Sequence, residues 1–147
     1  MNILPRLRTR YGEGIGVEIF ISPPDISENE KAFIATDASS GASSFTVDNG
    51  LMFAVGEYAV VGQIGPTKAE LVRIHTATAP TSTTITLNAA DSFAHNRGER
   101  ITYIPFNQIV IQRSTDSGSS YSDLATIDLR VDSTETYYQH TSGASND

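Results

Sequence analysis

Cysteine and tryptophan do not occur in this sequence, and basic residues are few. The 147 residues include no cysteine and only ten lysines and arginines, and the formal net charge is −7. The lack of cysteine excludes disulfides, thiolate zinc sites and cysteine nucleophiles. Nucleic-acid binding needs a concentrated basic face that displaces counterions, so the acidic balance argues against direct contact with nucleic acid.

Long apolar runs are missing as well. One of the longest strongly apolar stretches, residues 17–21, is far shorter than the ~20 residues that a helix needs to span a bilayer. The basic residues near the start are not followed by an apolar run of signal-peptide length. We therefore expect neither a targeting segment nor a membrane partner. A charged fraction of 18%, below the usual ~25%, also disfavours a coiled coil or a helix-rich enzyme.

The basic residues that are present gather at one end of the chain. Arg6, Arg8 and Arg10 lie within the first ten residues, with no acidic residue among them. From Ser114 onward the chain is acidic and Arg130 is its only basic residue. A basic end and an acidic end favour complementary contacts within an oligomer or with a scaffold, so the three arginines are candidate partner-binding residues. A solvated, unattached N-terminus is the alternative.

Short apolar or alternating segments predict an all-β chain. The clearest is residues 83–87, where Ile85 and Leu87 share one face and threonines, which favour strands, occupy the other. Turn residues rich in Gly, Pro, Asp and Asn separate the segments, as in a small antiparallel barrel or sandwich. The other expected strands are residues 17–21, 45–47, 57–62, 68–75, 100–104, 108–112, 121–129 and 134–138.

Composition divides the chain into three parts. We expect an extended N-terminal arm and linker over residues 1–42, a small β-barrel or sandwich over 43–107, and a second β unit over 108–147. Glycines at 12, 14 and 16 precede a strand and lack the lysine and helix of a phosphate loop, so they favour a hinge for the arm. The second unit has too few strands to close a sandwich, and we expect a partner chain, the barrel or further sequence to complete it.

Residues that could carry chemistry are scarce. His75, His95 and His140 form no recognisable metal-ligand pattern. Asp91 lies near His95 and serines are abundant, but no nucleophile elbow holds a serine for a Ser–His–Asp site. We therefore expect no enzyme, no cofactor and no metal site. The segment at 93–95 is interpreted as a loop anchor, with Phe93 buried and the His95 imidazole hydrogen-bonded to a neighbouring carbonyl.

Acidic and aromatic residues allow two further interpretations. Glu70 lies in an apolar strand, where an ion pair with Arg73 or Arg100 would satisfy its charge. Tyr137 and Tyr138 could stack on a sugar or contact another partner, together with tyrosines earlier in the chain. Three acids of the tail lack the alternation and central glycine of a calcium-binding loop and are expected to be solvated: Asp123, Asp128 and Asp132.

The central region resembles a β module of virion structural proteins of tailed bacteriophages. In that family a G-[DE]-Y strand leads through a glycine turn to a [KE]-A-E strand, followed by a T-[TI]-T-L strand and an F-A-H loop. The matching positions are residues 56–62, 68–70, 83–87 and 93–95. Residues 109–115, 124–127 and 136–138 are similar to the segment downstream of the module in that family and resemble part of a fibronectin-like sandwich. The likeness spans residues 45–138.

The resemblance implies a non-enzymatic component of a phage particle, located at the surface of its head or neck. The expected partners are the major capsid protein or other virion proteins, and the expected state is a homo-oligomer. An auxiliary capsid protein, for decoration or fibre anchoring, or a neck protein would attach through the N-terminal arm and the barrel edges. Two alternatives remain: a carbohydrate- or receptor-binding module of a phage tail or surface protein, and a hydrolase with His95 in a pocket.

Overall fold

The computed structural model describes residues 7–12, 16–22, 25–65, 68–131 and 136–140, and every regular element in these ranges is a β-strand. This confirms the expectation of an all-β fold. Among the described residues no helix is long and apolar enough to cross a membrane. The strands are β1 (Leu7–Gly12), β2 (Gly16–Ile21), β3 (Lys31–Phe33), β4 (Ser44–Thr46), β5 (Tyr58–Val61), β6 (Glu70–Arg73), β7 (Thr84–Thr86), β8 (Arg100–Ile104), β9 (Gln108–Arg113), β10 (Ser122–Asp128) and β11 (Thr136–His140).

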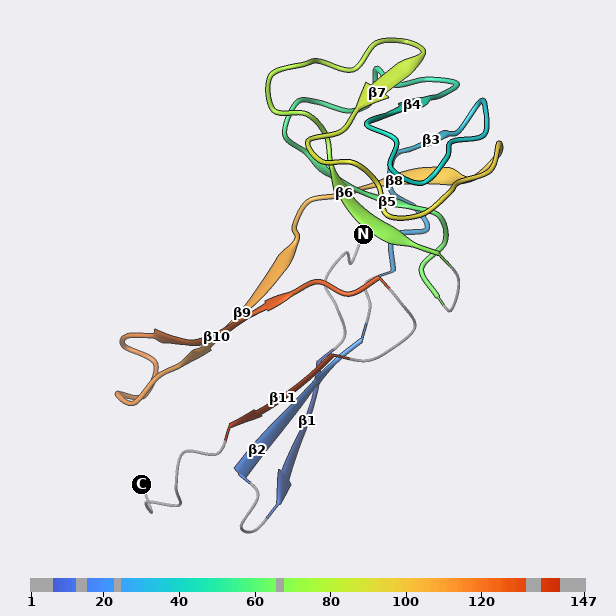
Figure 1. Cartoon of the computed structure of the whole chain (residues 1–147). Helices are drawn as coiled ribbons and strands as arrows, with labels where there is room; N and C mark the ends of the chain where they lie inside the picture. Colours follow the sequence, from blue (N-terminus) through green and yellow to red (C-terminus); the bar gives the residue numbers. More distant parts are fainter. Residues whose placement is uncertain (1–6, 13–15, 23–24, 66–67, 132–135, 141–147) are drawn as a thin grey trace.

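The described strands form four antiparallel sheets. A four-stranded sheet of order β3-β8-β5-β6 and a two-stranded sheet of β4 and β7 build a compact lobe, and we call the segment from β3 to β8 the lobe (Figure 1). A three-stranded sheet of order β1-β2-β11 and the two-stranded β9–β10 ribbon extend from the lobe. None of the described strands closes a barrel, so of the two expected architectures the open, sandwich-like one is observed.

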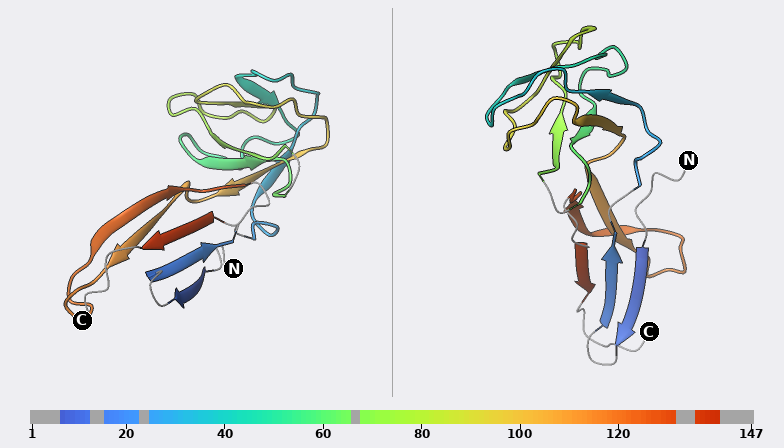
Figure 2. Two further views of the ribbon diagram at one scale, coloured as in Figure 1. Left: turned by 60° about the horizontal axis from the view of Figure 1, so that its bottom comes forward. Right: turned by 90° about the vertical axis from the view of Figure 1, so that its right-hand side faces the viewer.

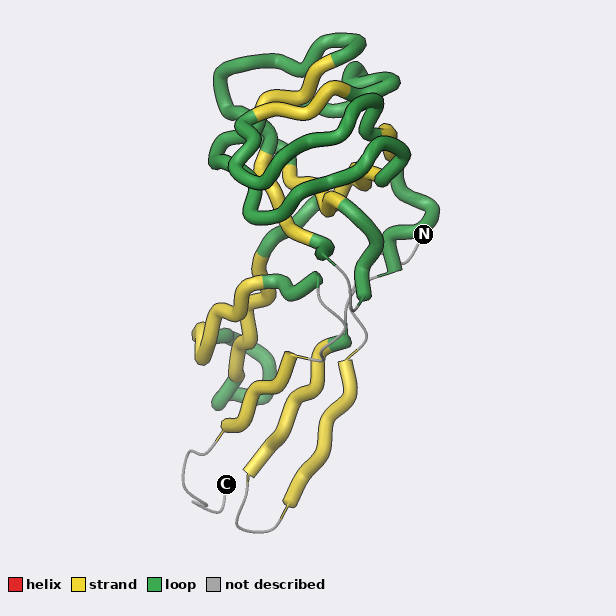
Figure 3. Tube along the Cα trace, turned by 45° about the vertical axis from the view of Figure 1, so that its right-hand side comes forward, coloured by secondary structure: helices red, strands yellow, loops and turns green. Residues whose placement is uncertain are grey.

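Long loops make up much of the lobe, whereas the extended part is mostly strand (Figure 3). The core of the lobe is nevertheless continuous, because short strands and isolated bridges place apolar side chains from both of its sheets against one another. Ile34 bridges to Val47, and Ile74 bridges to Leu87. This core cluster consists of Ala32, Ile34, Phe45, Val47, Phe53, Ala59, Val61, Val72, Ile74, Ile85, Leu87 and Ile101.

The central strand β5 is buried on both faces. Side chains alternate between the faces of a strand, so Ala59 and Val61 enter the core of the lobe, whereas Val60 enters a second cluster on the opposite side. That second cluster contains Leu129 and Val131, which follow β10. The uninterrupted apolar run of β5 is therefore explained by cover on both faces, and the second cluster joins the lobe to the segment after the ribbon.

Residues expected as an N-terminal arm include two long strands. β1 pairs with β2 along their whole length, from Leu7 opposite Ile21 to Gly12 opposite Gly16. β2 pairs on its other side with β11, so strands from the two ends of the chain share one sheet. Figure 2 shows the β9–β10 ribbon running beside this sheet. The lobe is thus inserted, in chain order, between the strands of the extended part.

Candidate functional site

His95 is a buried histidine of the lobe with carboxylates on both sides of its ring. Backbone hydrogen bonds in both directions with Ala38 fix the main chain at His95. The side chain is 1% exposed and meets the ring of Phe45 edge-on, with 5.7 Å between the ring centroids. Its Nε2 lies 2.7 Å from Glu70 Oε1, and its Nδ1 lies 2.8 Å from Glu99 Oε2.

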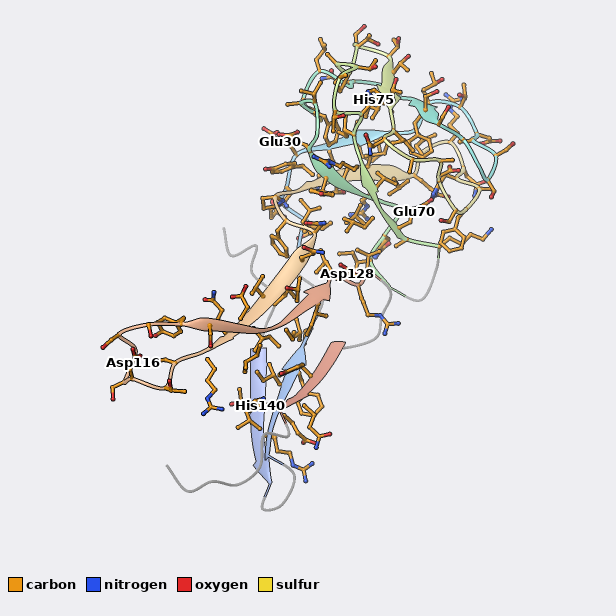
Figure 4. All side chains as sticks on the ribbon, turned by 60° about the vertical axis from the view of Figure 1, so that its left-hand side comes forward. Glu30, Glu70, His75, Asp116, Asp128 and His140 are labelled. Carbon is orange, nitrogen blue, oxygen red and sulfur yellow. The ribbon has the colours of Figure 1, made fainter. Side chains whose placement is uncertain are left out.

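Glu70 reaches this cluster from β6. Its carboxylate also accepts hydrogen bonds from the backbone N–H groups of Ser92, at 2.8 Å, and Phe93, at 3.4 Å. The predicted ion pair of Glu70 with an arginine is not observed. Arg73 instead donates to the carbonyl of Gly56 and lies over the ring of Tyr58. Figure 4 shows Glu70 on the part of the lobe that faces the rest of the molecule.

Glu99 belongs to the tight turn that follows His95. The N–H of Gly98, whose φ is +88°, donates to the carbonyl of Ile34; this left-handed conformation suits glycine. The Glu99 carboxylate accepts from the backbone N–H of Asn96 at 3.0 Å. Burial by itself would raise the pKa of Glu99, but the hydrogen bonds from Asn96 and His95 lower it below its ordinary value.

The electrostatics of the cluster favour a protonated imidazole. Burial would lower the pKa of His95, but the hydrogen bonds and charges of Glu70 and Glu99 outweigh it, so the pKa is raised above its ordinary value. Only an imidazolium can donate from both ring nitrogens. A ring with both nitrogens committed to carboxylates has none left to act as a base toward a substrate.

Asp91 is the third acid near His95 and, unlike Glu70 and Glu99, it is buried. It is 5% exposed, and its Oδ1 accepts a 2.7 Å hydrogen bond from the backbone N–H of Ala42. Its Oδ2 is buried and has no hydrogen-bond partner among the described residues. Carboxylate oxygens of Glu70 and Asp91 and a ring nitrogen of His95 lie within 4.8 Å of one another. One nitrogen and two oxygen donors of this kind suit a divalent transition-metal ion.

Two details of the predicted loop anchor are wrong. Phe93 is exposed, and the partners of His95 are carboxylates, not a backbone carbonyl. The sequence search considered Asp91 but missed Glu99, four residues after His95. The [KE]-A-E motif contains Glu70 and the F-A-H motif contains His95. The motifs therefore pointed to both residues, but not to the contact between them.

The candidate partner-binding arginines fall in or before β1. Arg6 lies outside the described residues. Arg8 is opposite Phe20 in the β1–β2 register, and Arg10 is opposite Glu18. The Arg10 Nε lies 3.9 Å from Glu18 Oε2, and the arginine side chain is 70% exposed. Arg10 therefore has an acidic neighbour within its own chain.

The candidate tyrosines lie in β11, the strand at the opposite edge of the same sheet from β1. Tyr137 is opposite Phe20 and Tyr138 is opposite Ile19. The ring of Tyr138 stacks on that of His140, with 6.5 Å between centroids and 20° between planes. Arg8 and Tyr137 thus flank the same residue of β2, so the sheet brings together the two sets of residues that were predicted from opposite ends of the chain.

No protein-family model, curated protein or solved structure matches this chain. The phage family expected from the sequence motifs therefore stays a prediction.

Proposed function

We propose that this chain is a non-enzymatic structural component of a tailed-phage particle, either an auxiliary capsid protein for decoration or fibre anchoring, or a neck protein. The proposed location is the particle surface, and the proposed partners are the major capsid protein, other virion proteins and further copies of the chain. The observation that carries the proposal is the β9–β10 ribbon. Its exposed apolar side chains support contact with another chain, and the resemblance of the sequence motifs to virion proteins supports a phage particle as the assembly.

The ribbon has little cover of its own. It consists of two strands, and a two-stranded hairpin is only marginally stable in water without further packing. Val110 in β9 is 48% exposed, and Tyr121, just before β10, is 63% exposed. Apolar side chains on a ribbon with two open edges favour pairing with another chain. An assembly partner would supply the cover that the described part of the chain does not provide.

The three-stranded sheet supports the same function. Its outer strands β1 and β11 each pair on one side only among the described residues. Arg8 and Arg10 lie on one outer strand, and Tyr137 and Tyr138 lie on the other. Arginine and tyrosine are enriched at protein interfaces, so both edges of this sheet offer suitable residues to a neighbouring subunit.

The buried cluster favours a structural role over catalysis. Both ring nitrogens of His95 are engaged by carboxylates, and the side chain is covered by Phe45. A hydrolase would need the imidazole beside a nucleophile and a substrate. The cluster instead connects β6 with the loop that follows β7.

A matched pair of surface variants tests the proposal. Val110→Lys alters the ribbon, and Val55→Lys alters a lobe loop at a valine of nearly equal exposure, 47% against 48%. The proteins of virions purified from a lysate that produces the chain are identified by mass spectrometry, and electron microscopy locates a tagged copy. We expect the wild type and Val55→Lys to be present in stoichiometric amounts and Val110→Lys to be depleted, with thermal unfolding unchanged. Absence of the wild type from virions would refute the proposal.

The same protein and virion preparations distinguish the carbohydrate- or receptor-binding alternative from the structural function. It requires glycan binding that is lost in Tyr137→Ala or Tyr138→Ala. Glycan binding by a chain that does not sediment with virion heads or necks would favour this alternative over the structural function.

A further inference from the structure

The acids around His95 outnumber the positive charge available to them. Asp91 is buried, and the side chains of Glu70 and Glu99 are 11% and 30% exposed. Glu70, Asp91 and Glu99 carry three negative charges, and a protonated His95 carries one positive charge, which leaves two negative charges in excess. Among the described residues no lysine or arginine forms an ion pair with any of these acids. Buried charges are ordinarily paired or bound to a metal ion. A divalent cation that replaces the proton on His95 Nε2 would reduce this excess from two negative charges to one.

The donor atoms converge on one point. A carboxylate oxygen from Glu70, one from Asp91 and a ring nitrogen of His95 lie within 4.8 Å of one another. Bonds of ~2.0–2.2 Å from oxygen and nitrogen to zinc place neighbouring ligand atoms ~3.3 Å apart in a tetrahedron. That arrangement requires His95 Nε2 and Glu70 Oε1 to separate from their present 2.7 Å and any more distant pair to close from at most 4.8 Å.

Asp91 supplies an independent sign of a missing ligand. The residue is 5% exposed, and its Oδ2 has no hydrogen-bond partner among the described residues. Leaving a buried polar atom without a partner costs about 1–3 kcal/mol, and more when the group is charged. A carboxylate held in this way is explained by a cation that it binds.

Each of these three side chains also has an atom that the protein holds by a hydrogen bond. Asp91 Oδ1 accepts from the Ala42 N–H, Glu70 Oε2 accepts from the Ser92 N–H, and His95 Nδ1 contacts Glu99. Metal-binding histidines characteristically donate their second ring N–H to a carboxylate, which fixes the ring orientation and strengthens the ligand. Glu99 occupies that position, which leaves Nε2 as the ligand atom.

We propose that Glu70, Asp91 and His95 form a structural binding site for a divalent transition-metal ion of the zinc class, with Glu99 as the positioning residue for His95. The ion takes the place of the proton between His95 Nε2 and Glu70 Oε1, and that proton leaves to solvent. Mixed imidazole and carboxylate donors favour zinc over calcium or magnesium, which prefer oxygen ligands alone. The ion would connect β6, the loop after β7 and, through Asp91, the loop at Ala42. The site does not depend on the proposed particle function.

The full chain is treated with a chelator, desalted and titrated with Zn2+, Ca2+ and Mg2+ by calorimetry, with thermal unfolding as a second readout. Co2+ serves as a spectroscopic probe. We expect one Zn2+ per chain, a higher unfolding temperature, and Co2+ absorption bands of a low-coordinate site. Calcium and magnesium should have no such effect.

Asp91→Asn is the decisive variant, because the amide keeps the Oδ1 acceptor for Ala42 while removing the charge. We expect it to weaken Zn2+ binding by about 100-fold or more and to leave the metal-free protein as stable as the wild type, or more stable. Asp37→Asn is the matched control, since Asp37 Oδ1 accepts from the Arg97 N–H on the same loop. His75→Gln controls for adventitious binding, and neither control should change the affinity.

Failure of the wild type to bind Zn2+ would overturn the proposal, as would equal binding by Asp91→Asn or loss of binding in His75→Gln. If Asp91→Asn does not fold, X-ray absorption at the zinc edge of the wild type decides. One imidazole with oxygen neighbours supports the site, and two or more imidazoles contradict it. These measurements do not involve virions, so they can fail while the proposed function stands.

Discussion

The lobe and the strands that extend from it differ in how many side chains they bury. In the lobe, Ala59, Val61, Ile74, Ile85 and Ile101 are completely buried although the strands that carry or adjoin them are only three to five residues long. In the β9–β10 ribbon the strands are six and seven residues long, yet no side chain in either strand is fully buried. Strand length therefore does not predict which region holds a core. The lobe buries one of its two apolar clusters entirely with its own residues, whereas the ribbon buries no side chain fully.

The polar groups of the two regions also differ in burial. The lobe buries His95 between two carboxylates, an arrangement that is stable only if every partner is in place. The ribbon places its polar network at an exposed tip, where Asp116 accepts hydrogen bonds from Ser114 and Ser120. Figure 4 shows Glu70 in the lobe and Asp116 at the far end of the ribbon. A defect in the first network should affect the whole lobe, and a defect in the second only the tip.

Truncating one aromatic residue in each region should give the largest contrast. Phe45 is 1% exposed and contacts His95, so Phe45→Ala should lower the free energy of unfolding by about 3–5 kcal/mol. Tyr121→Ala, at an exposed position beside the ribbon, should change it by no more than about 0.5 kcal/mol. Urea denaturation followed by circular dichroism measures both. Equal losses would mean that the ribbon is as much a part of the core as the lobe.

An intermediate effect is expected where the two regions meet. Leu129 is buried in the cluster with Val60 and Ile104, and its N–H donates to the carbonyl of Asn107. Leu129→Ala should cost about 2–3 kcal/mol and increase amide hydrogen exchange in the ribbon and β5. Amides of β4 and β7 should stay protected, because their side chains pack in the other cluster. Exchange that rises equally in β4 would contradict the separation into two cores.

The smallest effect is expected at the tip of the ribbon. Hydrogen bonds from the Ser120 hydroxyl, the Ser120 N–H and the Ser114 hydroxyl lower the pKa of Asp116 to about 2. A carboxyl whose pKa is lower in the folded than in the unfolded protein stabilises the fold above its unfolded value of ~3.9. That contribution is lost as the pH falls through about 2. In an NMR pH titration, the Ser120 amide should shift with this midpoint while core amides of the lobe do not.

Much of this architecture was predictable from local pattern. Alternation in residues 83–87 and the apolar runs at 57–62 and 100–104 indicated strands. Strands are present there, the first two one residue shorter at each end and the third as predicted. β1 was not predicted, although Leu7, Thr9 and Tyr11 alternate with Arg8 and Arg10, because its arginines favoured the interpretation as an extended arm. Its partner β2 lies nearby in sequence, but the pairing of β2 with β11 joins residues more than a hundred positions apart.

The side-chain contacts of the candidate site were likewise only partly predictable from the sequence. The motifs drew attention to Glu70 and His95, and Asp91 was noted because it is close to His95 in sequence. An arginine was the expected partner of Glu70, since ion pairs of acids with arginine are common on strands. The observed partner comes from a loop 25 residues later, and residue pattern alone does not specify which loop folds over which strand.

The sequence by itself determined the all-β class, the positions of most strands and the exclusion of thiol chemistry, because these follow from residue types and short-range periodicity. The tertiary structure decided that the sheets stay open, that strands from the two ends of the chain share one sheet, and that three acids gather around one buried histidine. Those features depend on contacts between distant segments, whose energies are set by burial and by the partners available after folding.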